Sequence, residues 1–253
     1  MSVTPRLRMF AGPNGSGKST IKEVLPPELL GVYINPDEIE KGLRQSGQLD
    51  FAAFSVPAAE ADTGILAHLG GSALLSKAGL LDEVEKLSCK DGRLDFNGVA
   101  VNSYFASVIA DFIRQQLLKS RISFTFETVM SSPDKVEFLR KAKQQGFRTY
   151  LYFVATQDPQ INISRVAHRV RVGGHPVPED KIVSRYHRSL DLLAEAVRHT
   201  DRAYIFDNSG SERVWLAEVT DGEEVEFKAE WMPHWFKTAL WDKFAADEDA
   251  GQD

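Results

Sequence analysis

The sequence contains little cysteine and no long hydrophobic run, and both absences exclude classes of protein. Cys89 is the only cysteine among 253 residues, which excludes an internal disulfide and a zinc site built from several thiolates. The six histidines do not have the paired spacing of metal ligands, so we expect no transition-metal site. No stretch approaches the ~18 apolar residues of a membrane span, and the N-terminus lacks the apolar core of a signal peptide. We therefore expect a cytoplasmic protein without membrane contact.

The charge balance argues against another class of partner. The chain has 30 basic and 36 acidic residues, a net charge of −6, and 43% of its residues are apolar. Nucleic acid and anionic membranes attract strongly basic surfaces, so neither is an expected partner. The apolar content is sufficient for a substantial core.

Apolar, β-branched and aromatic runs alternate with helical patterns along the chain. Strands are predicted at Arg6 to Ala11, Gly31 to Asn35, Ile122 to Glu127, Phe147 to Ala155 and Ala203 to Ser209. Helices are predicted near Lys18 and Asp37, and at Asn102 to Lys119, Pro133 to Gln145, Ile161 to Arg171 and Pro178 to His199. This alternation predicts a three-layer α/β fold of the P-loop NTPase/kinase class, in which a central, mostly parallel sheet of about five strands is covered on both faces.

Three segments depart from the alternation within one expected domain, 1–253. Residues 46–101 lack a clear strand and predict a helical insertion near the substrate site. Residues 211–246 predict a β-hairpin around Asp221-Gly222 and an aromatic-rich helix, whose tryptophans belong either to the core or to a partner surface. The acidic end, 247–253, is expected to be disordered.

The loop AGPNGSGKST, from Ala11 to Thr20, fills the G-x-x-x-x-G-K-[ST] pattern between a strand and a helix. Its glycines let backbone N–H groups surround a phosphate, its lysine reaches the β- and γ-oxygens, and the following serine can ligate Mg²⁺. The sequence therefore predicts bound ATP and Mg²⁺. The predicted nucleotide-binding residues of the loop are Gly12, Pro13, Asn14, Gly15, Ser16, Gly17, Lys18, Ser19 and Thr20.

Two motifs that would assign this loop to a motor or a switch are missing. No LSGGQ-like segment accompanies it, as in ABC-type ATPases, and no N-K-x-D string is present for guanine recognition. A kinase is therefore the favoured class.

Two carboxylates stand where a kinase needs them. Asp37, in INPDEI, follows the second strand and can act as a base for an acceptor hydroxyl, unless it and Glu38 only stabilise the start of a helix. Glu127 ends a strand and precedes Thr128, a position suited to metal or substrate binding, although a plain loop residue is the alternative.

Residues 163–189 carry arginines on two predicted helices joined by a glycine-containing loop. Arg165 and Arg169 lie one helical turn apart, and Arg185 and Arg188 repeat this spacing. Such a pair of helices is typical of a lid whose arginines neutralise charge on a transferred phosphoryl group, unless the arginines only solvate the helix faces.

Five motifs in this order resemble the zeta toxin family of P-loop kinases, especially its chromosomal branch. They are the loop AGPNGSGKST, called the cradle below, then INPDEI, FTFETVMSS, the run from Arg165 to Leu190 and YIFDNS. The resemblance covers about 1–45 and 102–210. The founding members use ATP and Mg²⁺ to phosphorylate the 3′-hydroxyl of the amino sugar in UDP-N-acetylglucosamine, which obstructs cell-wall synthesis.

The resemblance implies a role for each matching residue. Lys18 and Ser19 would hold nucleotide and metal, Asp37 would activate the acceptor hydroxyl, and Glu127 with Thr128 would contact acceptor or metal. Arg169 and Arg185 are the best matches to the catalytic lid arginines, and Arg165 is assigned to the nucleotide. The spacing differs from that of the toxins, which leaves Arg165, Arg171 and Arg188 as alternatives for the catalytic pair. An antitoxin protein would be the partner. The insertion has no counterpart in the founding toxins.

Two functions from different classes follow. The favoured one is a phosphotransferase that acts on a hydroxyl of a small molecule, such as a UDP-N-acetylamino sugar, as a toxin of a toxin–antitoxin system. The alternative is a regulatory module in which ATP only sets a conformation for a protein partner.

Overall fold

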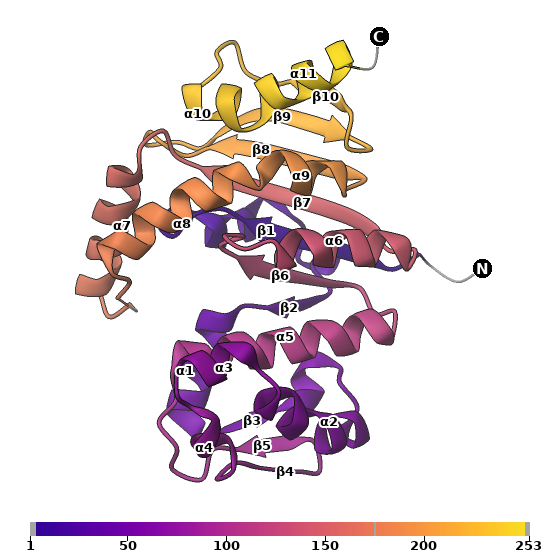
Figure 1. Ribbon diagram of the computed structural model, residues 1–253, viewed down its shortest axis with the longest axis vertical. Coiled ribbons are helices and arrows are strands. Elements are labelled where there is room, and N and C mark those ends of the chain that lie inside the picture. The colour runs from indigo at the N-terminus through magenta and orange to yellow at the C-terminus, as the bar shows by residue number, and fades with distance from the viewer. Residues whose placement is uncertain (1–3, 175, 251–253) are drawn as a thin grey trace. The chain divides into compact units, whose positions relative to one another are not determined.

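The chain forms two compact units (Figure 1), where the sequence predicted one domain. The computed structural model describes residues 4–174 and 176–250. Unit 1 comprises Met1–Leu30 and Glu127–Asp253, and unit 2 comprises Gly31–Phe126. Unit 2 has aromatic core contacts of its own, in which Phe51 meets Phe112 edge to face at 5.5 Å and Phe96 meets Phe105 at 5.4 Å.

Unit 1 is built on a five-stranded stretch of sheet. The strands are β1 (Arg6–Ala11), β7 (Arg148–Ala155), β8 (Arg202–Asp207), β9 (Val214–Thr220) and β10 (Glu224–Phe227), in the order β10-β9-β8-β7-β1. β1, β7 and β8 are parallel, and β9 and β10 continue the sheet as an antiparallel hairpin. The carboxyl ends of the three parallel strands therefore lie at one edge of the sheet, which is where ligands bind in open α/β folds.

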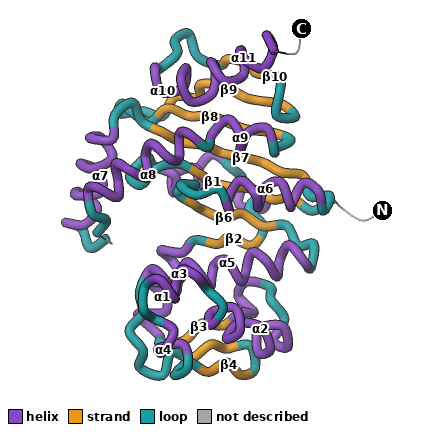
Figure 2. Tube along the Cα trace, viewed as in Figure 1, coloured by secondary structure: helices purple, strands orange, loops and turns teal. Residues whose placement is uncertain are grey.

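Along the chain, the helices of unit 1 come between these strands and after the last of them; Figure 2 shows helices and strands in different colours. The short helices η1 (Lys18–Val24) and η2 (Pro27–Leu29) are 3₁₀ helices, and η4 (Lys237–Trp241) is a π-helix. The α-helices are α6 (Asp134–Gln144), α7 (Pro159–Arg171), α8 (Glu179–Asp191), α9 (Leu193–Arg198), α10 (His234–Phe236) and α11 (Asp242–Ala250). The single helix predicted over Pro178 to His199 is divided into α8 and α9.

Unit 2 carries two further strands of the predicted pattern. β2 (Val32–Ile34) pairs in parallel with β6 (Phe124–Thr128), whose last two residues, Glu127 and Thr128, belong to unit 1. Helices α1 (Pro36–Ser46) and α5 (Ser103–Lys119) pack against each other. The sheet thus has seven strands where the sequence predicted about five, because the C-terminal hairpin adds β9 and β10.

The insertion, 46–101, was predicted to be helical, and this prediction was incomplete. It contains the helices η3 (Phe51–Phe54), α2 (Ala58–Gly70), α3 (Ala73–Lys77) and α4 (Leu81–Val84), together with an antiparallel sheet of order β3-β5-β4, made of β3 (Gln48–Asp50), β4 (Ser88–Lys90) and β5 (Arg93–Asp95). Each of these strands has three residues, too few to show the alternation that marks a strand in a sequence.

The C-terminal segment combines a buried and an exposed aromatic set. Trp235 is 3% exposed and belongs to the core, whereas Trp231 and Trp241 are 48% and 36% exposed. Helix α11 extends to Ala250, so 247–250 are helical where the sequence predicted disorder, and 251–253 lie outside the described residues. Within residues 4–174 and 176–250, no helix has the length and apolar character needed to cross a bilayer.

Candidate nucleotide site

The loop between β1 and η1 has a backbone that only glycine allows at three positions. Gly12, Gly15 and Gly17 have φ values of +141°, +77° and +98°. A Cβ atom added at Gly12 would lie 2.0 Å from the carbonyl oxygen of Val154, and one at Gly17 would lie 2.3 Å from Nδ2 of Asn208. Both distances are far below van der Waals contact, so the cradle depends on glycine for space as well as for conformation.

Two polar side chains of the loop, Lys18 and Thr20, turn onto its own backbone. Nζ of Lys18 donates to the carbonyl oxygens of Gly12 (2.8 Å) and Pro13 (2.9 Å), and the Thr20 hydroxyl donates to the carbonyl oxygen of Gly17 (2.8 Å). The Ser16 hydroxyl is fully buried and has no hydrogen-bond partner among the described residues. The ammonium group thus lies directly over the loop, where the negative charge of a phosphate would bind.

Ser19 and Glu127 are brought together, as the sequence analysis required of two metal ligands. The Ser19 hydroxyl donates to Oε2 of Glu127 at 3.1 Å, and Glu127 is 7% exposed at the end of β6. A carboxylate and a hydroxyl are hard oxygen donors of the kind that Mg²⁺ prefers, so these residues fit the ion. The described residues contain no group of three or more acidic, histidine or cysteine side chains that could hold a metal ion. Thr128 accepts the N–H of Met130 at 3.0 Å and shapes the turn that follows.

Two asparagines that the sequence analysis did not assign to the site brace the loop, the fully buried Asn162 and the half-buried Asn208. Asn162, on α7, donates from Nδ2 to the carbonyl oxygen of Asn14 at 2.6 Å. Asn208, just after β8, donates from Nδ2 to the carbonyl oxygen of Ser16 at 2.7 Å. The sequence analysis missed them because they are far from the loop along the chain. The position of Asn208 directly after the strand in YIFDNS could have indicated a residue near the nucleotide site.

The predicted lid arginines divide into two groups. Arg165 donates to the carbonyl oxygens of Asn208 (2.7 Å) and Gly210 (3.2 Å), and Arg185 donates to Oδ1 of Asn14 at 3.5 Å, so both contact the cradle or its support. Arg169 instead packs beside Gly174: a Cβ atom added at Gly174 would lie 2.5 Å from Cγ of Arg169.

Three other arginines and the predicted lid loop differ in how the structure places them. Arg171 and Arg188 are exposed. Arg213, which the sequence analysis missed, donates to the Thr20 hydroxyl at 2.8 Å. His175, in the predicted lid loop, lies outside the described residues.

Asp37 belongs to unit 2, in the first turn of α1. That helix is capped by Asn35, whose Oδ1 accepts the N–H of Asp37 at 2.8 Å, and Pro36 occupies the first turn. Asn35 therefore caps the helix, and Asp37 and Glu38 lie in its first turn, where carboxylates stabilise a helix N-terminus. The catalytic role of Asp37 stays a prediction.

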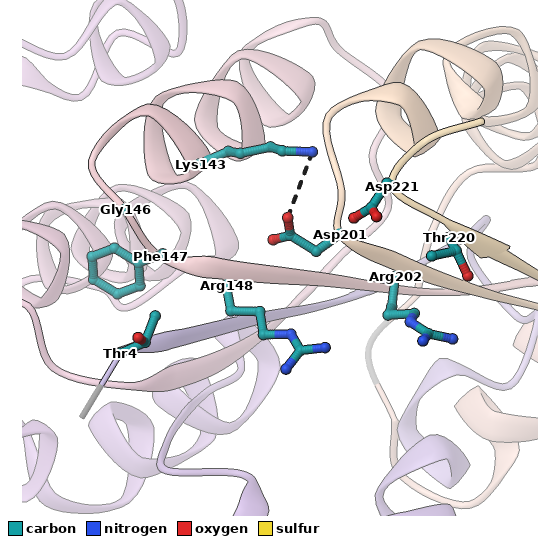
Figure 3. A pocket seen from close by; sticks show the side chains of 9 residues that line it. All are labelled: Thr4, Lys143, Gly146, Phe147, Arg148, Asp201, Arg202, Thr220 and Asp221. Atoms are coloured by element: carbon teal, nitrogen blue, oxygen red, sulfur yellow. Dashed lines mark ion pairs between the residues drawn. The ribbon is translucent and has the colours of Figure 1, made fainter. Parts of the chain in front are cut away.

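A pocket of about 560 Å³ lies at the amino ends of β7 and β8 in the unit 1 sheet (Figure 3). Arg148 and Arg202, which begin β7 and β8, line it together with Lys143 and Asp201. Nζ of Lys143 lies 3.6 Å from Oδ1 of Asp201, and Arg202 is paired with Glu218. Most of the charged side chains that line the pocket are therefore already neutralised within the protein. The pocket is remote from the cradle along the strands and is not the nucleotide site.

The mostly parallel sheet, and a cradle at the carboxyl edge of its strands, define an α/β protein of the P-loop class. The model of the zeta toxin family matches residues 95–220, and over this segment the chain belongs to that family. An uncharacterized protein of Haemophilus influenzae is 32% identical over 69 residues, which are 27% of this chain and 49% of that protein.

Solved structures share the fold at low sequence identity. The PezAT chromosomal toxin-antitoxin system of Streptococcus pneumoniae matches with a TM-score of 0.50 and 15% identity, over 97% of this chain and 88% of the other. The AvrRxo1-ORF1:AvrRxo1-ORF2 complex with sulphate ions matches with a TM-score of 0.53 and 16% identity, over 90% and 62%. The same complex solved with ATP gives 0.51 and 15%, over 96% and 64%. The chain thus spans about half of the curated relative and less than two thirds of the AvrRxo1 chains.

Proposed function

We propose that the protein is an ATP-dependent kinase of the zeta toxin type, which transfers the γ-phosphoryl group of ATP to a hydroxyl of a small molecule. The observation that carries this proposal is the 3.1 Å contact between the Ser19 hydroxyl and the Glu127 carboxylate beside the glycine cradle. A cradle alone only binds phosphates, whereas an adjacent pair of hard oxygen ligands lets a metal sit against them, as phosphoryl transfer requires.

The remaining roles follow from the chemistry of the transfer. Lys18, Arg165, Arg169 and Arg185 would bind the phosphates and stabilise the charge of the transferred group. Bound Mg²⁺, held by Ser19 and Glu127, would neutralise charge on the phosphate oxygens. Asp37 would accept the proton of the acceptor hydroxyl as its oxygen bonds to the γ-phosphorus and the bond to ADP breaks.

For the acceptor we propose a UDP-N-acetylamino sugar, and for the biological role a cytoplasmic toxin controlled by an antitoxin protein. The match of residues 95–220 to the zeta toxin family supports both, and PezAT, which shares the fold, is a toxin-antitoxin system. ATP as donor is supported by the AvrRxo1 complex that was solved with it.

A transfer assay tests the activity. Purified protein with γ-labelled ATP and Mg²⁺ is expected to label UDP-N-acetylglucosamine or another hydroxyl acceptor in a metabolite extract, detected by mass spectrometry. Asp37→Asn should abolish transfer while ATP still binds, and Glu38→Gln is the matched control that should retain it. If the wild type gives only slow hydrolysis with every acceptor, the protein is better described as an ATP-dependent regulatory module.

A growth assay tests the biological role separately. Expression of the wild type in a bacterial host should arrest growth, and Lys18→Ala should not, because the cradle then lacks its ammonium group. Equal growth with both would remove the toxin role and leave the kinase proposal to the transfer assay.

A further inference from the structure

The two asparagines that brace the cradle each hold a carbonyl oxygen. Asn162 binds the oxygen of Asn14, and Asn208 binds the oxygen of Ser16, at 2.6 and 2.7 Å. Asn162 is fully buried, and its Oδ1 accepts the Thr156 hydroxyl, which fixes the orientation of the amide. The backbone N–H of Asn208 donates to the carbonyl oxygen of Ala155 at 2.8 Å, so this residue is tied to the neighbouring strand β7.

Holding these carbonyl groups determines where the next N–H groups point. A trans peptide directs its C=O and its N–H to opposite sides, and the described chain has no cis peptide bond. When the Asn14 and Ser16 oxygens point outward onto the asparagines, the N–H groups of Gly15 and Gly17 point to the opposite side. Within the described residues neither N–H donates to a protein acceptor, so both can bind an anion.

A carbonyl oxygen turned toward a phosphate would repel it, whereas an N–H attracts it. We infer that Asn162 and Asn208 are positioning residues, which aim the N–H groups of Gly15 and Gly17 at the phosphates of the nucleotide. This inference rests on the proposed nucleotide-dependent function and adds to it the groups that hold the cradle in its binding conformation.

The turn that carries Asn208 is held by a buried carboxylate, that of Asp207. Asp207 is 2% exposed, and it accepts hydrogen bonds from the N–H (2.9 Å) and the hydroxyl (2.8 Å) of Ser209 and from Nε1 of Trp235 (2.7 Å). The Ser209 hydroxyl also accepts the N–H of Gln157 at 2.8 Å. The turn at Asp207-Asn208-Ser209 is therefore fixed on both sides, and α10 contributes to it through Trp235. This accounts for the letters DNS in YIFDNS.

Two variants test the inference at different distances from the nucleotide. Asn208→Ala removes the donor to the Ser16 oxygen, and Trp235→Phe keeps an aromatic ring but removes one donor to Asp207. Calorimetric titration with ATP and Mg²⁺ is expected to show affinity about tenfold weaker for Asn208→Ala and about threefold weaker for Trp235→Phe, since one hydrogen bond contributes about 0.5–1.5 kcal/mol. Because these residues shape binding, the KM for ATP should rise while kcat changes much less. Trp231→Phe, at a 48% exposed position, is the control.

The outcomes separate this inference from the proposed function. If the wild type does not bind ATP, the proposed function fails and this inference fails with it. If the wild type binds and both folded variants bind equally well, the positioning role is overturned and the function stands. A lower melting temperature with unchanged ATP affinity would likewise overturn it, because the residues would then be purely structural.

Discussion

At the residue scale, the cradle glycine Gly17 and the exposed Gly42 of helix α1 predict opposite effects of the same substitution. Gly17→Ala should weaken ATP binding by at least tenfold, because its φ is +98° and the new Cβ would force Asn208 away from the Ser16 oxygen. Gly42 has no atom within 4 Å of an added Cβ, so Gly42→Ala should raise the free energy of unfolding by about 0.5–1 kcal/mol. Denaturant unfolding and ATP titration of both variants check this. Wild-type ATP affinity in Gly17→Ala would contradict it.

The contact between Ser19 and Glu127 predicts a change in metal dependence. Glu127→Gln preserves the size of the side chain and an oxygen acceptor for the Ser19 hydroxyl, but it removes the negative charge that would attract Mg²⁺. The Mg²⁺ concentration for half-maximal activity should rise at least tenfold, and ATP binding without metal should change little. Glu137→Gln, at an exposed position of α6, is a suitable control. An unaltered Mg²⁺ titration in Glu127→Gln would exclude Glu127 from the metal site.

At the scale of elements, the sequence predicted correctly those strands and loops that a local residue pattern determines. Strand β1 was predicted with the bounds that it has, and the cradle was recognised because its glycines and lysine lie within seven consecutive residues. The three-residue strands of the insertion carry no such pattern. Asn162 and Asn208 were missed for another reason: their partners in the cradle are 148 and 192 residues away, and only the folded sheet brings them together.

The contact of α8 with the end of β7 yields a prediction for an element. The Tyr186 hydroxyl donates to the carbonyl oxygen of Thr156 at 2.6 Å, and Tyr186 is 3% exposed. Tyr186→Phe leaves that buried carbonyl without this donor, which should lower the free energy of unfolding by about 1–3 kcal/mol. Tyr104→Phe, at a 39% exposed position, should leave it unchanged. Urea unfolding of the two variants would show it, and equal midpoints would mean that Tyr186 does not help to fix α8.

At the scale of the whole molecule, the candidate nucleotide site of unit 1 combines residues that are far apart in the sequence. The cradle follows the first strand, while Asn208, Asp207 and Trp235 come from the last parallel strand and the C-terminal segment. Loss of the C-terminal segment would therefore remove the Trp235 donor to Asp207 as well as core side chains. The predicted ATP affinity belongs to the complete unit rather than to the loop that the sequence identifies.

Buried tyrosines in unit 1 also predict how the protein responds to alkali. Burial raises the pKa of Tyr152 from 10.0 to about 12, with a smaller contribution from Tyr204, and burial followed by Asp158 and Asp207 raises the pKa of Tyr186 to about 12. Between pH 10 and 12 the unfolded chain ionises these phenols while the folded chain keeps them protonated, so the unfolded state gains stability as the pH rises. The free energy of unfolding should be constant with respect to these groups below pH 10 and fall through that window.

Urea unfolding at pH 9, 10.5 and 11.5 measures this decline. The double variant Tyr152→Phe/Tyr186→Phe should show a shallower decline than the wild type, because two of the groups that bind protons more tightly in the folded state are gone. Its absolute stability at pH 9 will be lower, since the Tyr186 hydrogen bond is lost, so the slope between pH values is the informative quantity. Parallel curves for the two proteins would show that these phenols ionise equally in the folded and unfolded states.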